Sequence, residues 1–148
     1  MNKIKFFFLK PKTVVIAGQG RKKTKEMILR VLNKHIRDVF VFETEKTDNL
    51  SFFIKHSKLP VLVDDEKVKA GEEILSFGFD EKNDVFASDI KINGGINFKV
   101  NHKGSFVPFW TASSGEADFK EQILPVLPAV CVGTFLGLNL VEISQSLK

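Results

Sequence analysis

The feature that most constrains the fold is a strand, glycine turn, helix and strand that follow one another near the start of the chain. Residues 13–17 (TVVIA) are a short apolar run, and a Gly-Gln-Gly turn occupies 18–20. Over 23–37 the apolar residues recur at helical spacing, and 39–42 is a second apolar strand. This order is typical of the βαβ unit of a parallel sheet, so we expect an α/β domain.

Weaker signals predict the elements of the remaining chain. A third strand is expected over 59–63, and Asp64, Asp65 and Glu66 are expected to end it. An antiparallel meander with tight turns is expected from runs at 73–79, 85–92, 96–101 and 105–110. Two helices should follow, over about 119–136 and 141–147. Pro125 and Pro128 lie inside the first, which should therefore start late or kink.

Length and composition exclude several classes of protein. The 148 residues are 43% hydrophobic and 27% charged, which is typical of one globular domain, here taken as 1–148. The one cysteine, Cys131, excludes a disulfide framework, and we expect it to be a core residue. No apolar run approaches the ~18 residues of a membrane span, and the start of the chain lacks a signal-peptide pattern. We therefore expect a cytoplasmic protein without a membrane partner.

Charge is distributed unevenly along the chain. Residues 1–37 contain 11 Lys or Arg and one acidic residue, whereas the remainder contains 11 basic and 17 acidic residues. A basic first quarter indicates contact with an anion, which could be a nucleotide, a nucleic acid or an anionic surface.

The Gly-Gln-Gly turn partly fits a phosphate-binding loop. Such a loop places backbone N–H groups and a lysine around phosphates at a helix N-terminus, and a Ser or Thr hydroxyl then holds Mg²⁺. The candidate phosphate contacts are Gly18, Gly20, Arg21, Lys22 and Thr24, with Thr24 also a candidate Mg²⁺ ligand. The Gly-Lys-Thr triplet is missing, so the alternative is a glycine turn that enters a solvated basic helix.

Two carboxylates at the end of the third strand are further candidates for a metal site. Asp64 and Asp65 follow that strand directly, where ligands often bind in α/β sheets. The alternative is a solvated turn that caps the next segment. The histidines are scattered, and we expect them to be surface residues rather than catalytic bases: His35, His56 and His102.

Several segments resemble the central, ATP-binding domain of the Mur ligases. Residues 13–32 resemble the family's nucleotide-binding segment and include its Lys-Glu-Met at 25–27. Residues 61–66 resemble the strand that ends in Asn-x-Asp-Asp, and 75–110 is similar to the D-Ala-D-Ala-adding branch. Residues 120–147 resemble the helical end of that domain. The resemblance implies a P-loop-like three-layer domain with a short parallel sheet, an antiparallel meander and C-terminal helices, and it implies ATP and Mg²⁺ as cofactors.

The chain departs from the family pattern at its catalytic positions. The loop can be aligned with the family pattern in two registers. When positions are counted back from Lys-Glu-Met at 25–27, the family's catalytic lysine falls on Arg21 and its first threonine on Lys22. When they are counted forward from Gly18, the lysine falls on Lys22 and the threonine on Lys23. Neither register places a hydroxyl at the magnesium position. The family's metal-binding stretch has no counterpart here, which indicates an internal deletion between about 43 and 60. At the helical end, the family's His and Asn correspond to Glu121 and Val126.

The resemblance therefore implies a shortened Mur-ligase-like domain that at most binds ATP or its phosphates. Its relatives ligate peptide to a peptidoglycan precursor, but this chain by itself is not expected to catalyse that ATP-dependent amide-bond formation. The alternatives are a basic module that binds nucleic acid or another polyanion, and a structural or interaction protein. The chain could also form a homodimer by pairing through an exposed sheet edge.

Overall fold

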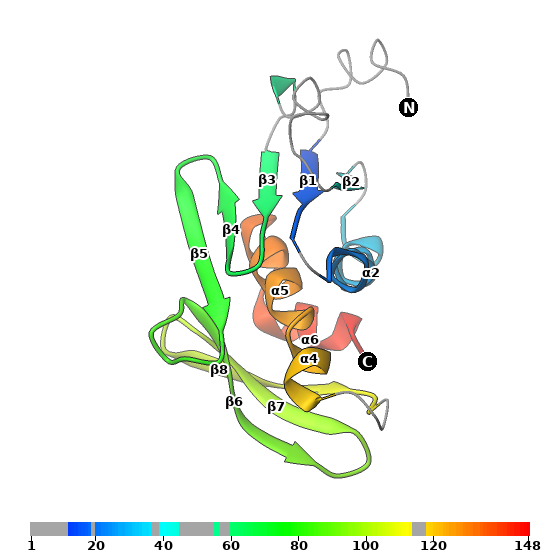
Figure 1. Ribbon diagram of the computed structural model, residues 1–148, viewed down its shortest axis with the longest axis vertical. Helices are drawn as coiled ribbons and strands as arrows, with labels where there is room; N and C mark the ends of the chain where they lie inside the picture. The colour runs from blue at the N-terminus through cyan, green and yellow to red at the C-terminus, as the bar shows by residue number, and fades with distance from the viewer. Residues whose placement is uncertain (1–11, 19, 37–38, 45–54, 57–59, 114–117) are drawn as a thin grey trace.

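Figure 1 shows the computed structural model of the chain, which describes residues 12–18, 20–36, 39–44, 55–56, 60–113 and 118–148. The described strands are β1 (Lys12–Ile16), β2 (Val39–Glu43), β3 (Pro60–Val63), β4 (Lys67–Ala70), β5 (Glu73–Gly78), β6 (Val85–Ile92), β7 (Ile96–His102) and β8 (Ser105–Thr111). The described helices are α2 (Arg21–Asn33), α4 (Phe119–Ile123), α5 (Val126–Phe135) and α6 (Leu140–Ser146). The expected α/β fold with C-terminal helices is confirmed. The suspected deletion and the segment that leads into β1 lie almost wholly outside the described residues.

The strands form one sheet in the order β2-β1-β3-β4-β5-β6-β7-β8. β1 pairs in parallel with β2 on one side and β3 on the other, which confirms the predicted parallel sheet. β3, β4 and β5 are antiparallel neighbours, and so are β6, β7 and β8. The meander prediction holds for these last three strands.

Two details of the sheet differ from the prediction. At each of them an aspartate side chain accepts hydrogen bonds from backbone N–H groups. Asp64 Oδ1 accepts hydrogen bonds from the backbone N–H groups of Glu66 and Lys67, both at 2.9 Å, so the chain returns at once as β4, a strand that was not predicted. Asp84 Oδ2 accepts from the Ser76 backbone N–H at 2.9 Å, which holds the 79–84 loop against β5. β6 then runs parallel to β5, not antiparallel as expected.

Helix α2 begins two residues earlier than its apolar periodicity predicts. Gly20, its N-cap, has a left-handed backbone and carries no capping side chain. The buried stripe of α2 includes Ile28, Val31 and Leu32, which pack in the same core as Val14 and the other inward-facing residues of the sheet. The helix ends at Asn33, short of the predicted residue 37.

The expected break at the prolines is confirmed, and it divides one predicted helix into α4 and α5. Pro125 is the N-cap of α5, and Pro128 is its third residue. The first N–H groups of a helix have no intrahelical acceptor, so a proline costs little in that turn. α6 then begins at a capping box in which the Asn139 side chain accepts from the Glu142 backbone N–H at 2.8 Å.

Helix α5 lies at the centre of the core, where it contacts α2, α4, α6 and strands β4–β6. Its residues from Val126 to Gly133 are all buried. In the described part of the chain, no helix is both long and apolar enough to cross a membrane.

The two outer strands of the sheet differ in how their edges are protected. β8 carries Pro108, which has no N–H to offer, and the Ser144 hydroxyl donates to the Pro108 carbonyl at 2.8 Å. α6 therefore occupies part of this edge. β2 is the other outer strand of the described sheet, and the homodimer through a sheet edge stays a prediction.

The close approach of α5 to α6 and α2 depends on Gly133. A Cβ there would lie 2.8 Å from Ile143 Cδ1 and 3.3 Å from Val31 Cγ1. We expect Gly133→Val to lower the free energy of unfolding by about 1–3 kcal/mol, because the added carbons must push these helices apart. Urea unfolding measures this, with the neighbouring Thr134→Val as the control that should change stability little. Equal stability of the two variants would contradict the packing described.

Candidate functional site

The turn between β1 and α2 depends on two glycines with positive φ. Gly18 has φ of 91° and Gly20 has φ of 70°. A Cβ on Gly18 would overlap the Asp65 carboxylate, whereas a Cβ on Gly20 would meet nothing within 4 Å. The Arg21 guanidinium folds back and donates through Nη1 to the Gly18 carbonyl at 3.3 Å. The turn is therefore in direct contact with the turn that joins β3 to β4.

A cavity of about 360 Å³ opens beside this turn, at the carboxyl ends of β1 and β3. Ligands commonly bind at this position in parallel sheets. The cavity brings together four of the residues predicted from the sequence: Gly20, Thr24, Asp64 and Asp65. Gly18 joins them through its contact with Asp65. The phosphate and metal roles of these residues stay predictions, but their proximity is a finding.

Thr24 has a buried side chain at this cavity. The residue is 8% exposed, and it lines the cavity next to Gly20 and Lys23. Its backbone N–H donates to the Gly20 carbonyl at 3.1 Å, as expected in the first turn of a helix. Among the residues that the structure describes, its hydroxyl has no hydrogen-bond partner. A hydroxyl that lines a cavity and has no protein partner can donate to or accept from a ligand there.

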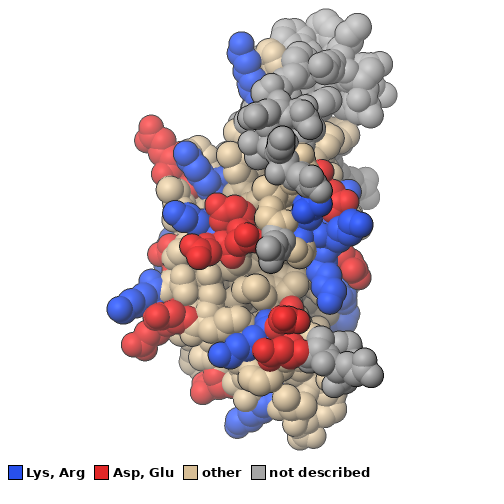
Figure 2. All heavy atoms as spheres, viewed as in Figure 1, with Lys and Arg blue, Asp and Glu red and all other residues tan. Residues whose placement is uncertain are grey.

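The first turn of α2 concentrates positive charge. Arg21, Lys22 and Lys23 follow one another there, and this turn contains no acidic residue. Together with Gly20 they line a second hollow of about 270 Å³ on the outer side of the turn. In Figure 2 the basic side chains gather over α2, and acidic side chains gather over the turn between β3 and β4. The two predicted cations, Arg21 and Lys22, thus line the outer hollow, while Lys23 lines both spaces.

Asp64 has a structural role in the turn between β3 and β4. Its Oδ1 accepts the two backbone hydrogen bonds described above, and its own N–H donates to the Lys67 carbonyl at 3.0 Å. This is the turn-capping role that the sequence left open as the alternative to metal binding. Asp65, by contrast, presents its carboxylate to Gly18.

Sequence reasoning missed most of the opposite wall of the cavity and named only Glu121, through the family resemblance. Phe77 comes from β5, and Glu121, Leu124, Pro125 and Pro128 come from the segment that joins α4 to α5. About a hundred positions separate that segment from Gly20, and no local pattern links the two. Pro125 and Pro128 predict a helix break from the sequence, but they do not predict that the break faces the glycine turn. Lys23 entered the sequence analysis only as the residue on which the family's first threonine falls in one register, and not as a ligand contact.

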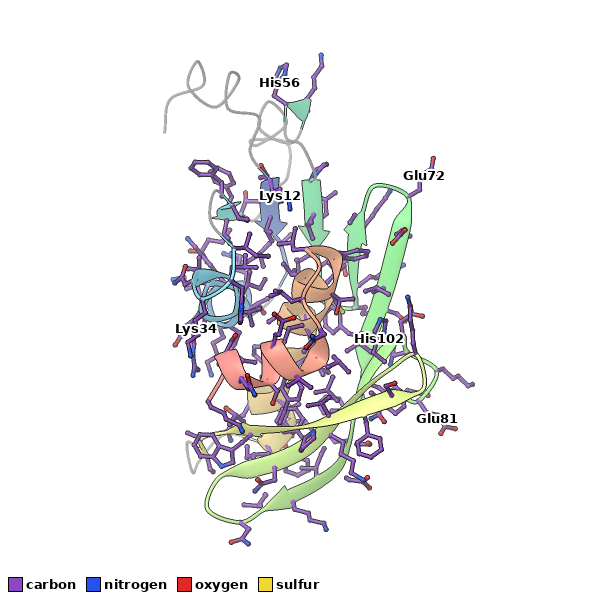
Figure 3. The ribbon with its side chains drawn as sticks, turned by 180° about the vertical axis from the view of Figure 1, so that it is seen from behind. Lys12, Lys34, His56, Glu72, Glu81 and His102 are labelled. Carbon is purple, nitrogen blue, oxygen red and sulfur yellow. The ribbon has the colours of Figure 1, made fainter. Side chains whose placement is uncertain are left out.

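The other nucleophile and base candidates have structural roles. Burial, with a smaller contribution from the Asp84 carboxylate, raises the pKa of the Cys131 thiol far above its ordinary value, so it is unreactive. His56 and His102 lie far apart (Figure 3). His102 Nδ1 is 3.1 Å from the Asp84 carbonyl, at the start of the meander.

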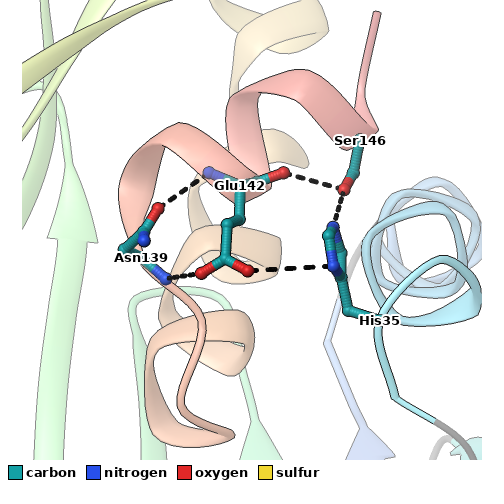
Figure 4. Close-up of polar contacts among 4 residues, drawn as sticks. All are labelled: His35, Asn139, Glu142 and Ser146. Atoms are coloured by element: carbon teal, nitrogen blue, oxygen red, sulfur yellow. Dashed lines mark hydrogen bonds and ion pairs between the residues drawn. The ribbon is translucent and has the colours of Figure 1, made fainter.

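His35, Ser146 and Glu142 have a superficial likeness to a hydrolytic triad (Figure 4). His35 Nε2 lies 2.9 Å from the Ser146 hydroxyl, and its Nδ1 lies 3.9 Å from Glu142 Oε2. The Ser146 hydroxyl, however, donates to the Glu142 carbonyl at 2.8 Å, and the residue is only 3% exposed. The serine proton is thus committed to the backbone, so this cluster ties the end of α2 to α6.

Comparison with known proteins shows the fold of this chain. No protein-family model matches the chain, and neither does any curated protein. A crystal structure of MurF from Acinetobacter baumannii matches with a TM-score of 0.72 and 16% identity, over 98% of this chain and 46% of that one. A structure of MurF from Thermotoga maritima in complex with ADP matches with a TM-score of 0.62 and 13% identity, over 96% of this chain and 50% of that one.

A third match has a fuller name and supports the same conclusion. It is the UDP-N-acetylmuramoylalanyl-D-glutamyl-2,6-diaminopimelate–D-alanyl-D-alanyl ligase from Acinetobacter baumannii, with a TM-score of 0.65, 14% identity, and coverage of 98% of this chain and 47% of that one. This chain therefore spans about half the length of the matched ligases and has the fold of that half. The expected fold relationship to the D-Ala-D-Ala-adding Mur ligases is confirmed.

The two glycines of the turn should differ in how much an alanine substitution lowers the free energy of unfolding. Gly18→Ala should destabilise the protein more than Gly20→Ala. Each alanine would have to adopt a left-handed backbone, which costs roughly 1–2 kcal/mol. Only the alanine at position 18 would also displace the Asp65 carboxylate. Urea unfolding of the two variants measures the difference. An equal loss for both would show that the Gly18–Asp65 contact is not tight in solution.

Proposed function

We propose that this chain is a shortened Mur-ligase-like domain that binds ATP, or the phosphates of ATP, at the first turn of α2. The observation that carries the proposal is the composition of that turn: an uncapped helix N-terminus, three consecutive cations, and a Thr24 hydroxyl at the cavity that has no hydrogen-bond partner among the described residues. The ADP bound to the fold relative from Thermotoga maritima agrees with this ligand class.

Electrostatics favour an anion at this place. The N-terminus of a helix carries a partial positive charge, so basic residues in the first turn are unfavourable by a few tenths to about 1 kcal/mol each. α2 carries Arg21, Lys22 and Lys23 there and no acidic residue in that turn. A phosphate group would remove this repulsion and would accept hydrogen bonds from the backbone N–H groups that Gly20 leaves without a capping side chain.

The cavity beside the turn fits the remainder of a nucleotide. Its volume of about 360 Å³ lies within the range of small-molecule sites. Its far wall includes Glu121 and also the apolar residues Phe77, Leu124 and Pro128, and the apolar part suits the flat face of a base. Phosphates held by the first turn of α2, between the basic hollow and the cavity, and a base against the apolar part of the cavity wall would place one nucleotide across the Gly20 turn.

Nucleotide binding is proposed here without ligation. A ligase must also hold two substrates in line and stabilise an acyl phosphate. Within the described residues, no group of three or more His, Cys, Asp or Glu side chains has the arrangement of a metal site. One basic loop and one cavity account for binding but not for these further steps.

Calorimetry with ATP tests the proposal. Arg21→Ala combined with Lys22→Ala should weaken ATP binding at least about tenfold, because hydrogen bonds to charged groups contribute about 1.5–3 kcal/mol each. The matched control combines Lys34→Ala and Lys82→Ala, which removes the same charge from exposed positions outside the turn.

The outcomes separate the proposal from its alternatives. Saturable ATP binding that only the first pair of substitutions abolishes would support the phosphate site. Equal weakening by both pairs, with a steep dependence on salt, would indicate general attraction of polyanions such as nucleic acid. Absence of binding at millimolar ATP would overturn the proposal.

A further inference from the structure

We infer that Lys23 supplies the positive charge that a divalent cation supplies in a typical nucleotide site, so phosphate binding here does not require Mg²⁺. The inference rests on the proposed function, because it concerns how the same site holds its anion. It assigns a role to a residue that occupies the family's first threonine position in one of the two registers but carries an ammonium group instead of a hydroxyl.

Lys23 is placed between the two halves of the site. It is the third residue of α2, and it lines both the cavity and the basic hollow on the outer side of the turn. Its side chain is exposed, and no ion pair of Lys23 is seen in the part of the chain that the structure describes. Its ammonium group is therefore available to an anion from either side.

Thr24 provides an independent indication that a ligand occupies this cavity. The residue is more than nine-tenths buried, it lines the cavity directly beside Lys23, and its hydroxyl has no hydrogen-bond partner among the described residues. A phosphate oxygen that accepts from this hydroxyl would lie within reach of the Lys23 ammonium group.

The acidic side of the cavity makes a cation necessary. Asp64, Asp65 and Glu121 line the same space, so a phosphate would be repelled unless positive charge lay between them. A magnesium ion prefers several oxygen ligands in octahedral geometry. Asp64 Oδ1 is already used by two backbone hydrogen bonds, and a metal beside Thr24 would lie next to a lysine of like charge. The donors present thus fit an ammonium group better than Mg²⁺.

The experiment is ATP calorimetry in Mg²⁺ and in excess EDTA, on the full chain and on Lys23→Ala, Lys23→Arg and Lys34→Ala. The unaltered chain should bind ATP equally well in both buffers, within about threefold, and Lys23→Ala should lose at least about tenfold in EDTA, as expected for a charged hydrogen bond. Lys23→Arg should retain most of the affinity. Lys34→Ala, which removes an exposed lysine at the far end of α2, should match the unaltered chain.

Each other result overturns a distinct part of the account. If the unaltered chain binds ATP only with Mg²⁺, the inference fails while the proposed function stands. If binding survives EDTA but Lys23→Ala binds as well as the unaltered chain, the assignment to Lys23 fails. If the unaltered chain binds ATP in neither buffer, the proposed function fails with it.

Discussion

The position of β1 in the sheet is the constraint on which the site depends. β1 pairs in parallel on both sides, and Val14, Val15 and Ile16 are buried. The chain must therefore leave the sheet abruptly after Ile16, and only a turn with positive φ at Gly18 and Gly20 directs α2 back across the core. Because β3 is the parallel neighbour of β1, its own end brings Asp65 against Gly18. One buried strand thus determines where the turn, the cavity and the first turn of α2 meet.

Opposite charges face each other at this meeting point, and the positive side lies at a helix N-terminus that is itself positive. The first turn of α2 combines a helix N-terminus with Arg21, Lys22 and Lys23, and the facing turn carries carboxylates. A fold selected for stability alone would place acidic residues at this end of the helix, as α6 does with Glu142. The contrast between the two helices is the physical reason for interpreting the start of α2 as an anion site rather than as a solvated surface.

Local patterns in the sequence predict the parts of the fold that local forces determine. Residues 13–17, 39–42 and 59–63 are continuous apolar runs, so their pairing as parallel strands was predictable. Burial was predicted for all three, but β2 is only half-buried throughout. β4 was not, since its four residues, KVKA, follow a turn whose decisive hydrogen bonds come from a single side chain, that of Asp64. The parallel pairing of β5 with β6 was not predicted either, and it is accompanied by a hydrogen bond between two residues eight positions apart, Ser76 and Asp84. The glycine turn of the site was predictable from the sequence. The cavity wall between α4 and α5 was not, because only the tertiary fold brings it to that turn.

The central claim is that the β1–α2 turn binds phosphate, and amide NMR during an ATP titration tests it most directly. The account predicts saturable shifts at Gly18, Gly20 and the first residues of α2, with smaller shifts near Pro125 and no shifts along β7. Shifts confined to the β6–β8 meander, or none at millimolar ATP, would contradict it. In that case the likeness to MurF would extend to the fold and not to the ligand.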